Sequence, residues 1–184
     1  SSTKGGSDTI DYQVNALDRP ALRMAFKDTL ICSIDTLQLQ AIGTGIFEWT
    51  AHPTLINGNV GSPLVFPKDT TTYTVKLTDN GCVATETVTV NVIDRVTLNA
   101  GPDTTICLTD SVRMRPMSNA LYFSWQPAAI FAAPSSRNAT ALPTAATTTI
   151  VVRASVGKCF ADDSLVVKTV PYPTVNAGND TTIC

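Results

Sequence analysis

The chain has 184 residues, a formal net charge of −2 and no run of 18 apolar residues, so no segment predicts a membrane-spanning helix. Its cations are scattered rather than gathered into a basic stripe, which argues against a nucleic-acid partner. The single histidine, His52, and the lack of any Cys-x-x-Cys pair leave a zinc site without support.

A short motif of Asp, Thr and Cys occurs three times, at 28–32, 103–107 and 180–184. Phe47-Glu48-Trp49 recurs in the same way as Phe123-Ser124-Trp125. A fixed period of about 76 residues is typical of tandem modules. The predicted organisation is the last strand of a preceding module at 1–19, module one at 20–95, module two at 96–172 and the start of a following module at 173–184. Because Cys184 falls inside the motif, we expect the chain to be a piece of a longer protein.

Alternation of apolar and polar residues predicts β-strands along the whole chain. The expected strands lie at 10–14, in module one at 22–25, 28–32, 36–39, 46–50, 64–66, 71–78 and 82–93, and in module two around 112–114, 121–125, 150–154 and 165–169. Asp79-Asn80-Gly81 predicts a hairpin turn, because Asn and Gly tolerate a positive φ. The predicted fold class is all-β, with tandem immunoglobulin-like antiparallel β-sandwich modules and Trp49 and Trp125 in their structural cores.

Several motifs follow one another in a fixed order along nearly the whole chain. They are Asn-Ala-Gly-x-Asp-Thr-Thr-Ile-Cys at 99–107 and 176–184, Thr-Thr-Thr-Tyr-Thr-Val at 70–75, and Asp-Asn-Gly-Cys at 79–82. This order resembles the tandem PKD-like, immunoglobulin-like repeats of large Bacteroidota surface proteins. Many of those are gliding or attachment adhesins exported by the type IX secretion system. Module two departs from the pattern at Thr149-Ile150 and at 156–159, which leaves the fold expectation intact.

The resemblance implies an extracellular, cell-surface location and a structural function. We expect a stalk of a long adhesin or filament, partnered by neighbouring modules of the same chain. One alternative is a polysaccharide-binding module that uses the loops 51–63 and 126–140, with Phe131 and Pro134 as contact residues. Another is an accessory spacer of a secreted hydrolase. No Ser-His-Asp order or phosphate-binding loop is present, so an enzyme is not expected.

Asp followed by Ser or Thr, and then by an apolar residue or Thr, recurs along the chain. One interpretation is turn chemistry, in which Asp caps loop amides and Thr favours the strand. The other, implied by the resemblance, is O-glycosylation. The hydroxyl residues concerned are Thr9, Thr29, Thr36, Thr70, Thr104, Ser111, Ser164 and Thr181. Both interpretations can hold at once, because turn positions are accessible to glycans.

Five cysteines at positions locked to the repeat predict disulfides and therefore an oxidising compartment. The preferred pairs are Cys32–Cys82 and Cys107–Cys159, within each module, with Cys184 unpaired. The alternative is Cys32–Cys159, across the junction, because the two cysteines of one module could lie at opposite ends of a strand. No cofactor is expected. Asp162-Asp163 and Asp79 could contribute to a calcium site, but no loop has the carboxylate content of an EF-hand.

Overall fold

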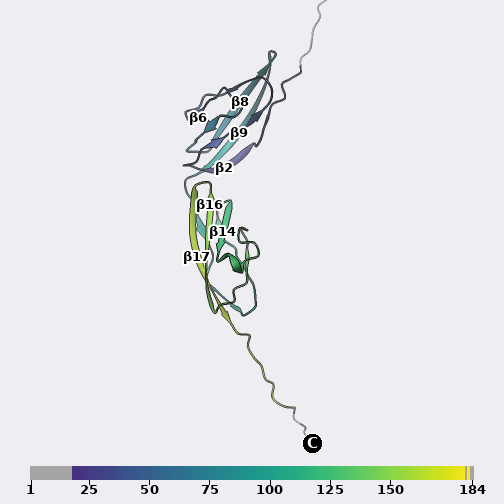
Figure 1. The fold of residues 1–184 in the computed structure, drawn as a ribbon, viewed down its shortest axis with the longest axis vertical. Helices are drawn as coiled ribbons and strands as arrows, with labels where there is room; N and C mark the ends of the chain where they lie inside the picture. Colours follow the sequence, from purple (N-terminus) through teal and green to yellow (C-terminus); the bar gives the residue numbers. More distant parts are fainter. Residues whose placement is uncertain (1–17, 181, 183–184) are drawn as a thin grey trace, which may run out of the picture. The chain divides into compact units, whose positions relative to one another are not determined.

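The computed structural model describes residues 18–180 and 182, and these form two units (Figure 1). Unit 1 comprises Gln38–Val65, Thr72–Val88 and the described residues up to Lys27. Unit 2 comprises Asp28–Leu37, Phe66–Thr71 and the described residues from Thr89 onward. Parts of the first repeat therefore belong to the same unit as the whole second repeat. The module boundaries themselves stay a prediction, and the predicted strand at 10–14 lies outside the described residues.

The first repeat consists of short strands and one long hairpin. Its strands are β1 (Arg23–Met24), β2 (Asp28–Cys32), β3 (Leu37–Gln38), β4 (Ala41–Ile42), β5 (Ile46–Trp49), β6 (Leu55–Ile56), β7 (Leu64–Val65), β8 (Thr71–Asp79) and β9 (Cys82–Ile93). The sheets have the orders β2-β9-β8-β5, β3-β7-β6 and β1-β4. The predicted hairpin turn is confirmed, with positive φ at Asn80 (48°) and Gly81 (81°). Residues 72–79 of β8 and 82–88 of β9 belong to unit 1, whereas Thr71 and residues 89–93 belong to unit 2.

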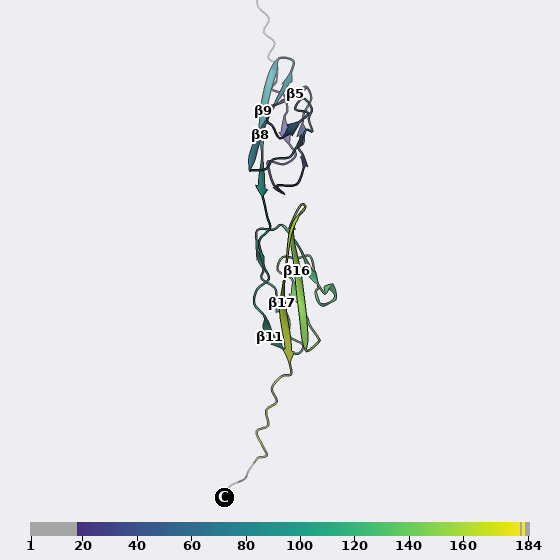
Figure 2. The ribbon, with the colours of Figure 1, turned by 90° about the vertical axis from the view of Figure 1, so that its left-hand side faces the viewer.

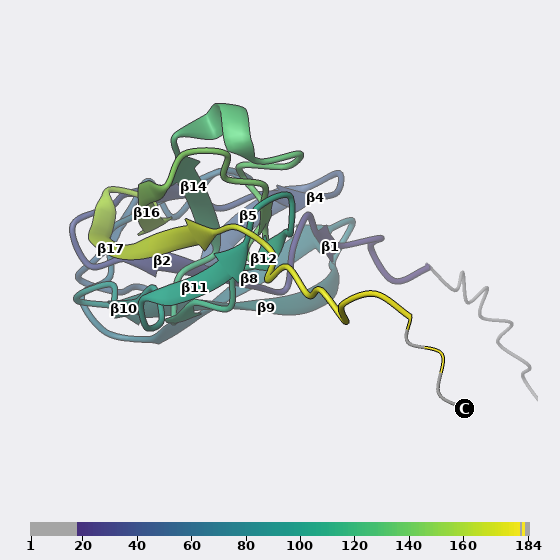
Figure 3. The same cartoon turned by 90° about the horizontal axis from the view of Figure 1, so that it is seen from below.

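The second repeat follows the same plan. Its strands are β10 (Leu98–Asn99), β11 (Thr104–Cys107), β12 (Val112–Arg113), β13 (Met117–Ser118), β14 (Tyr122–Gln126), β15 (Thr140–Ala141), β16 (Thr147–Val156) and β17 (Cys159–Val170). A 3-10 turn, η1 (Ala128–Ile130), follows β14 (Figure 3). The sheets have the orders β11-β17-β16-β14, β10-β13 and β12-β15, and β16 and β17 form a long hairpin (Figure 2).

The all-β, immunoglobulin-like sandwich prediction is confirmed, with one exception to its antiparallel character. β2 pairs in parallel with β9, and β11 pairs in parallel with β17. The cause is visible in the first strand, which has two segments. β1 pairs with β4, and β2 then joins a different sheet, beside the last strand of the repeat. Because both strands run towards the same end, β2 and β9 finish together, with Cys32 opposite Ile93.

The core side chains follow the predicted alternation. In β8, Tyr73, Val75 and Leu77 are buried, and in unit 2 a single cluster gathers the buried faces of β14, β16 and β17. Trp49 and Trp125 are buried as predicted, with exposed fractions of 4% and 0%. The indole N–H of each tryptophan donates a hydrogen bond to a backbone carbonyl in the loop that follows its strand. Trp49 donates to Val60 O and Trp125 to Ser136 O, both at 2.9 Å. A buried tryptophan needs such a partner, so the loop and the core are fixed together.

Candidate functional site

The most distinctive site in unit 2 is a disulfide between the end of β2 and the beginning of β17. Cys32 and Cys159 are bonded, with 5.6 Å between their Cα atoms and 127 residues between them in the sequence. Cys32 is fully buried. The bond therefore links the first sequence repeat to the second.

The preferred pairing, Cys32–Cys82 and Cys107–Cys159, is wrong, and the strand register explains why. Cys107 lies opposite Val170, the last residue of β17, whereas Cys159 is the first residue of that strand. Eleven steps of about 3.3 Å separate these ends by roughly 36 Å, and a disulfide needs Cα atoms within about 7 Å. Cys32 and Cys82 have the same relation to β9. The alternative pairing, Cys32–Cys159, is confirmed.

A buried aspartate, Asp35, forms hydrogen bonds with the backbone on both sides of the disulfide. The Asp35 carboxylate, only 8% exposed, accepts a hydrogen bond from the backbone N–H of Lys158 at 3.1 Å. It also accepts one from the N–H of Cys32, at 3.1 Å. Asp35 therefore holds together the two backbone segments that the disulfide joins. Hydrogen bonds to a charged acceptor are among the stronger ones in proteins.

The turn of the β16–β17 hairpin is shaped to receive that carboxylate. Gly157 has a φ of 53°, and a Cβ at this position would lie 2.6 Å from Cγ of Asp35. Any side chain here would displace the aspartate, so glycine is required for contact as well as for backbone conformation. Leu30 and Ile93 pack against the core cluster of the second repeat and complete the site.

Sequence reasoning missed the role of Asp35, which it considered only as the residue before Thr36. A signal was present: Cys-x-x-Asp occurs at 32–35 and again at 107–110. An aspartate three residues after a cysteine is unremarkable by itself. Its recurrence at the same repeat position, beside a cysteine, could have marked it as part of a disulfide site.

Replacing Asp35 with asparagine is expected to lower the free energy of unfolding of unit 2 by about 1.5–3 kcal/mol, because two backbone donors lose a charged acceptor. Asp110→Asn is the matched control, since Asp110 occupies the same repeat position but is exposed. Its effect should be under about 1 kcal/mol. Chemical denaturation of the oxidised proteins measures both changes. Equal effects at the two positions would contradict the role assigned to Asp35.

The predicted O-glycosylation residues lie in different environments. Thr36, Thr70, Ser111 and Ser164 are exposed, Thr29 and Thr104 are half-buried, and Thr9 and Thr181 lie outside the described residues. Two of the aspartates accept hydrogen bonds from backbone amides, although Asp163 lies within β17 rather than in a turn. Asp163 accepts the N–H groups of Ser164 and Ala100, at 2.8 and 2.7 Å, and Asp103 accepts that of Val166 at 2.8 Å. Capping leaves the neighbouring hydroxyls accessible where they are exposed.

Two of the acidic residues considered for calcium, Asp162 and Asp163, have other partners. Arg153 donates two hydrogen bonds of 2.8 Å to Asp162, which lowers the pKa of that carboxyl and raises the pKa of Arg153. Asp163 caps backbone amides, as described above. Within 18–180 and 182, no three His, Cys, Asp or Glu side chains gather in a way that could hold a metal ion. The same residues contain no helix that is long and apolar enough to cross a membrane.

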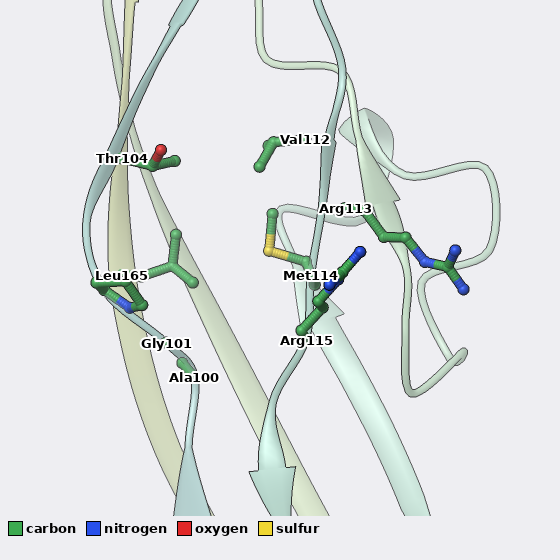
Figure 4. A pocket seen from close by; sticks show the side chains of 9 residues that line it. Ala100, Gly101, Thr104, Val112, Arg113, Met114, Arg115 and Leu165 are labelled. Carbon is green, nitrogen blue, oxygen red and sulfur yellow. The ribbon is translucent and has the colours of Figure 1, made fainter.

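A cavity of about 230 Å³ lies in the second repeat, between β12 and the segment that precedes β11 (Figure 4). Met114 and Leu165 face each other across it, while Arg113 points away. Gly101 is at its edge, where the first repeat has the half-buried Phe26 at the equivalent position. The cavity thus coincides with an aromatic side chain that the second repeat lacks. We interpret it as a packing gap.

The two residues proposed as polysaccharide contacts in the loop 126–140 differ in exposure. Phe131 is buried against Trp125, with 5.8 Å between ring centroids. Pro134 is half-buried, and its carbonyl accepts the backbone N–H of Trp125 at 2.8 Å. The expectation that Phe131 contacts a ligand is therefore wrong, because the ring packs on the core.

Comparisons with known proteins give the following picture. No family model matches the chain, and no curated protein matches it. Among solved structures it is similar to Drosophila OTK extracellular domains 3–5, with 11% identity, a TM-score of 0.42 and coverage of 82% of this chain and 62% of that chain. It is also similar to Sidekick-1 immunoglobulin domains 1–5, with 10% identity, a TM-score of 0.38 and coverage of 82% and 40%. A titin I-band fragment has 12% identity, a TM-score of 0.40 and coverage of 83% and 66%.

The chain thus spans less than two thirds of the length of the OTK and Sidekick-1 structures. At these identities and TM-scores the likeness carries no argument about function.

Proposed function

We propose that the chain is a structural repeat segment, a stalk, of a long extracellular surface protein, which holds distal parts away from the cell. The observation that supports this most strongly is the Cys32–Cys159 bond, which joins one repeat to the next. A bond inside one module would stabilise that module only. A bond between repeats also fixes their connection, which benefits a protein that must transmit tension.

The extracellular location is supported by the same bond, because disulfides persist in oxidising compartments. The finer assignment, to a gliding or attachment adhesin of Bacteroidota exported by type IX secretion, is part of the proposal and rests on the sequence resemblance. An accessory spacer in a secreted hydrolase is compatible with the same structural role. We propose no catalytic role and no cofactor for this segment.

Single-molecule stretching of the 184-residue chain from its two ends tests the structural role. In the oxidised protein, tension passes directly from Cys32 to Cys159 and bypasses the residues between them. Reduction should release this segment and lengthen the fully extended chain by roughly 420–460 Å, at 3.3–3.6 Å for each of 127 residues. Oxidised Cys32→Ser should extend like the reduced chain. Equal lengths before and after reduction would contradict a tension-bypassing bond.

Polysaccharide binding remains the rival function, and a glycan array tests it with the same chain. Because Phe131 is buried, we expect no binding above that of a Phe131→Leu variant, which keeps an apolar core side chain. Binding by the natural chain that the variant loses would favour the rival.

O-glycosylation is proposed for the exposed hydroxyls of Thr36, Thr70, Ser111 and Ser164. We expect the intact mass of native material to exceed that of the bare sequence, and the excess to fall when these residues are replaced by alanine. A native mass equal to the bare sequence would contradict the proposal.

A further inference from the structure

The end of β11 in the second repeat reproduces the surface that receives the hairpin in the first. We call Cys32, Asp35 and Ile93 the first docking surface, and Cys107, Asp110 and Val170 the second. Cys32 lies opposite Ile93, and Cys107 lies opposite Val170, both in parallel register.

The two surfaces share their backbone hydrogen bonds, although the turn after the cysteine differs at one residue: Thr109 has a φ of 78°, and its equivalent Ile34 has no positive φ. The Asp35 N–H donates to Cys32 O at 2.9 Å, and the Asp110 N–H donates to Cys107 O at 3.0 Å. One residue after each cysteine, the N–H of Ser33 donates to Ile93 O at 2.9 Å, and that of Leu108 to Val170 O at 2.8 Å. A tight turn therefore follows both cysteines and keeps an aspartate three residues after each of them.

The two surfaces differ in what covers them among the described residues. The first surface holds the β16–β17 hairpin, so Cys32 is fully buried and Ile93 packs on the neighbouring core. On the second surface Cys107 is a half-buried free thiol, and Leu108 and Val170 are 43% and 44% exposed. The Asp110 carboxylate accepts the Tyr172 hydroxyl instead of a hairpin amide, which raises the pKa of Tyr172.

We propose that the second docking surface binds a β-hairpin from a further repeat of this type, by a disulfide to Cys107 and a carboxylate cap from Asp110. This inference rests on the proposed structural role and names its partner. In the step, a Cys107–cysteine S–S bond forms and the S–S bond of a small disulfide such as oxidised glutathione breaks. The two protein thiols are oxidised, and their protons and electrons pass to the two glutathione thiols released.

The first docking surface, which holds a hairpin, shows which residues the turn of a docked hairpin needs. Its first turn residue is Gly157, because a Cβ there would overlap the Asp35 carboxylate, and the cysteine follows two residues later. The hairpin of the first repeat has Asn80 at the equivalent position, with a side chain where the docking carboxylate would lie. The second surface should therefore prefer a Gly-x-Cys hairpin over Asn-Gly-Cys.

The test extends the chain in register, by replacing residues 173–184 with a copy of residues 96–172. In that copy Cys107→Ser removes the duplicated thiol, so the tryptic peptide 96–113 reports on the original Cys107 alone, and Ser164→Ala, at an exposed position, gives the 159–168 peptide of the copy a distinct mass. After refolding with oxidised and reduced glutathione, thiols are blocked and linked peptides are mapped without reduction. We expect 96–113 linked to the mass-marked 159–168 peptide of the copy, together with 28–68 linked to the unmarked 159–168 peptide of the original repeat. The second link shows in the same molecule that the natural site has formed.

Two variants make the readout specific. Asp110→Asn in the original repeat, or Gly157→Asn in the appended copy, should lower the ratio of linked to unlinked Cys107 roughly tenfold at a fixed glutathione ratio. Neither should change the link to 28–68. Cys107 recovered as a blocked thiol or glutathione adduct while 28–68 is linked would overturn the proposal, as would a bond to Cys82. Such a result would not contradict the proposed function, because the stretching test uses the unextended chain and depends only on the Cys32–Cys159 bond.

Discussion

Replacing Cys32 with serine is expected to lower the free energy of unfolding of unit 2 by roughly 2–5 kcal/mol. The bond closes a loop of 127 residues, for which the chain-entropy model gives a contribution of about 5 kcal/mol. The variant also places a hydroxyl at a position that is fully buried. Because the net stability of a small domain is of this order, the variant should be close to its unfolding threshold at physiological temperature.

Denaturant titration of oxidised protein measures this change. Cys159→Ser should have a similar effect, and the double variant should be little worse than either single variant, since both remove one bond. Cys107→Ser is the control, because its half-buried thiol carries no disulfide, and we expect a change within about 0.5–1 kcal/mol. A Cys32→Ser variant that unfolds like the natural protein under oxidising conditions would refute a stabilising role for the bond.

Replacing Trp125 with alanine should lower the free energy of unfolding of unit 2 by about 3–5 kcal/mol. Its side chain is fully buried against Phe131 and within the core cluster. Alanine leaves a large cavity, and the carbonyl of Ser136 also loses its indole donor. The loop that contains Phe131 should loosen together with the core, because the tryptophan connects them.

Two variants separate these contributions. Trp125→Phe keeps much of the ring volume and removes the N–H, so it should cost less than the alanine variant. Tyr122→Ala lies on the same strand, but its side chain is 68% exposed, and its effect should stay near 0.5 kcal/mol. Thermal or chemical unfolding, followed by circular dichroism, ranks the three variants by their loss of stability. A Trp125→Ala effect no larger than that of Tyr122→Ala would contradict the assigned core position.

The long strands could be predicted from sequence because their alternation follows the burial of their side chains, whereas short strands such as β6, in the stretch 51–63 that was expected to be a loop, could not. Tyr73, Val75 and Leu77 alternate with polar residues, and all three face the core. The limits of β9 also follow from sequence, since the Asn80-Gly81 turn precedes it and Asp94 follows its last residue. Alternation shows which face of a strand is buried.

Alternation does not show which strand lies beside which, or in what direction. The parallel pairing of β2 with β9 was therefore not predicted, and this pairing places Cys32 and Cys82 at opposite ends of β9. The disulfide could not be assigned from the repeat, because each cysteine recurs once per module in either pairing. Asp35 was missed for a related reason. Its partner, the N–H of Lys158, lies 123 residues away, and only the fold brings the two together.

Disulfide mapping of the oxidised 184-residue chain tests the central claim most directly. Trypsin places each cysteine in a separate peptide: 28–68, 77–95, 96–113, 159–168 and 169–184. After thiols are blocked under denaturing conditions, mass spectrometry of the unreduced digest identifies the linked pair. The Cys32–Cys159 bond predicts 28–68 linked to 159–168, with 96–113 recovered as a blocked thiol. A link from 28–68 to 77–95, or from 96–113 to 159–168, would show that the bonds lie within modules and would contradict it.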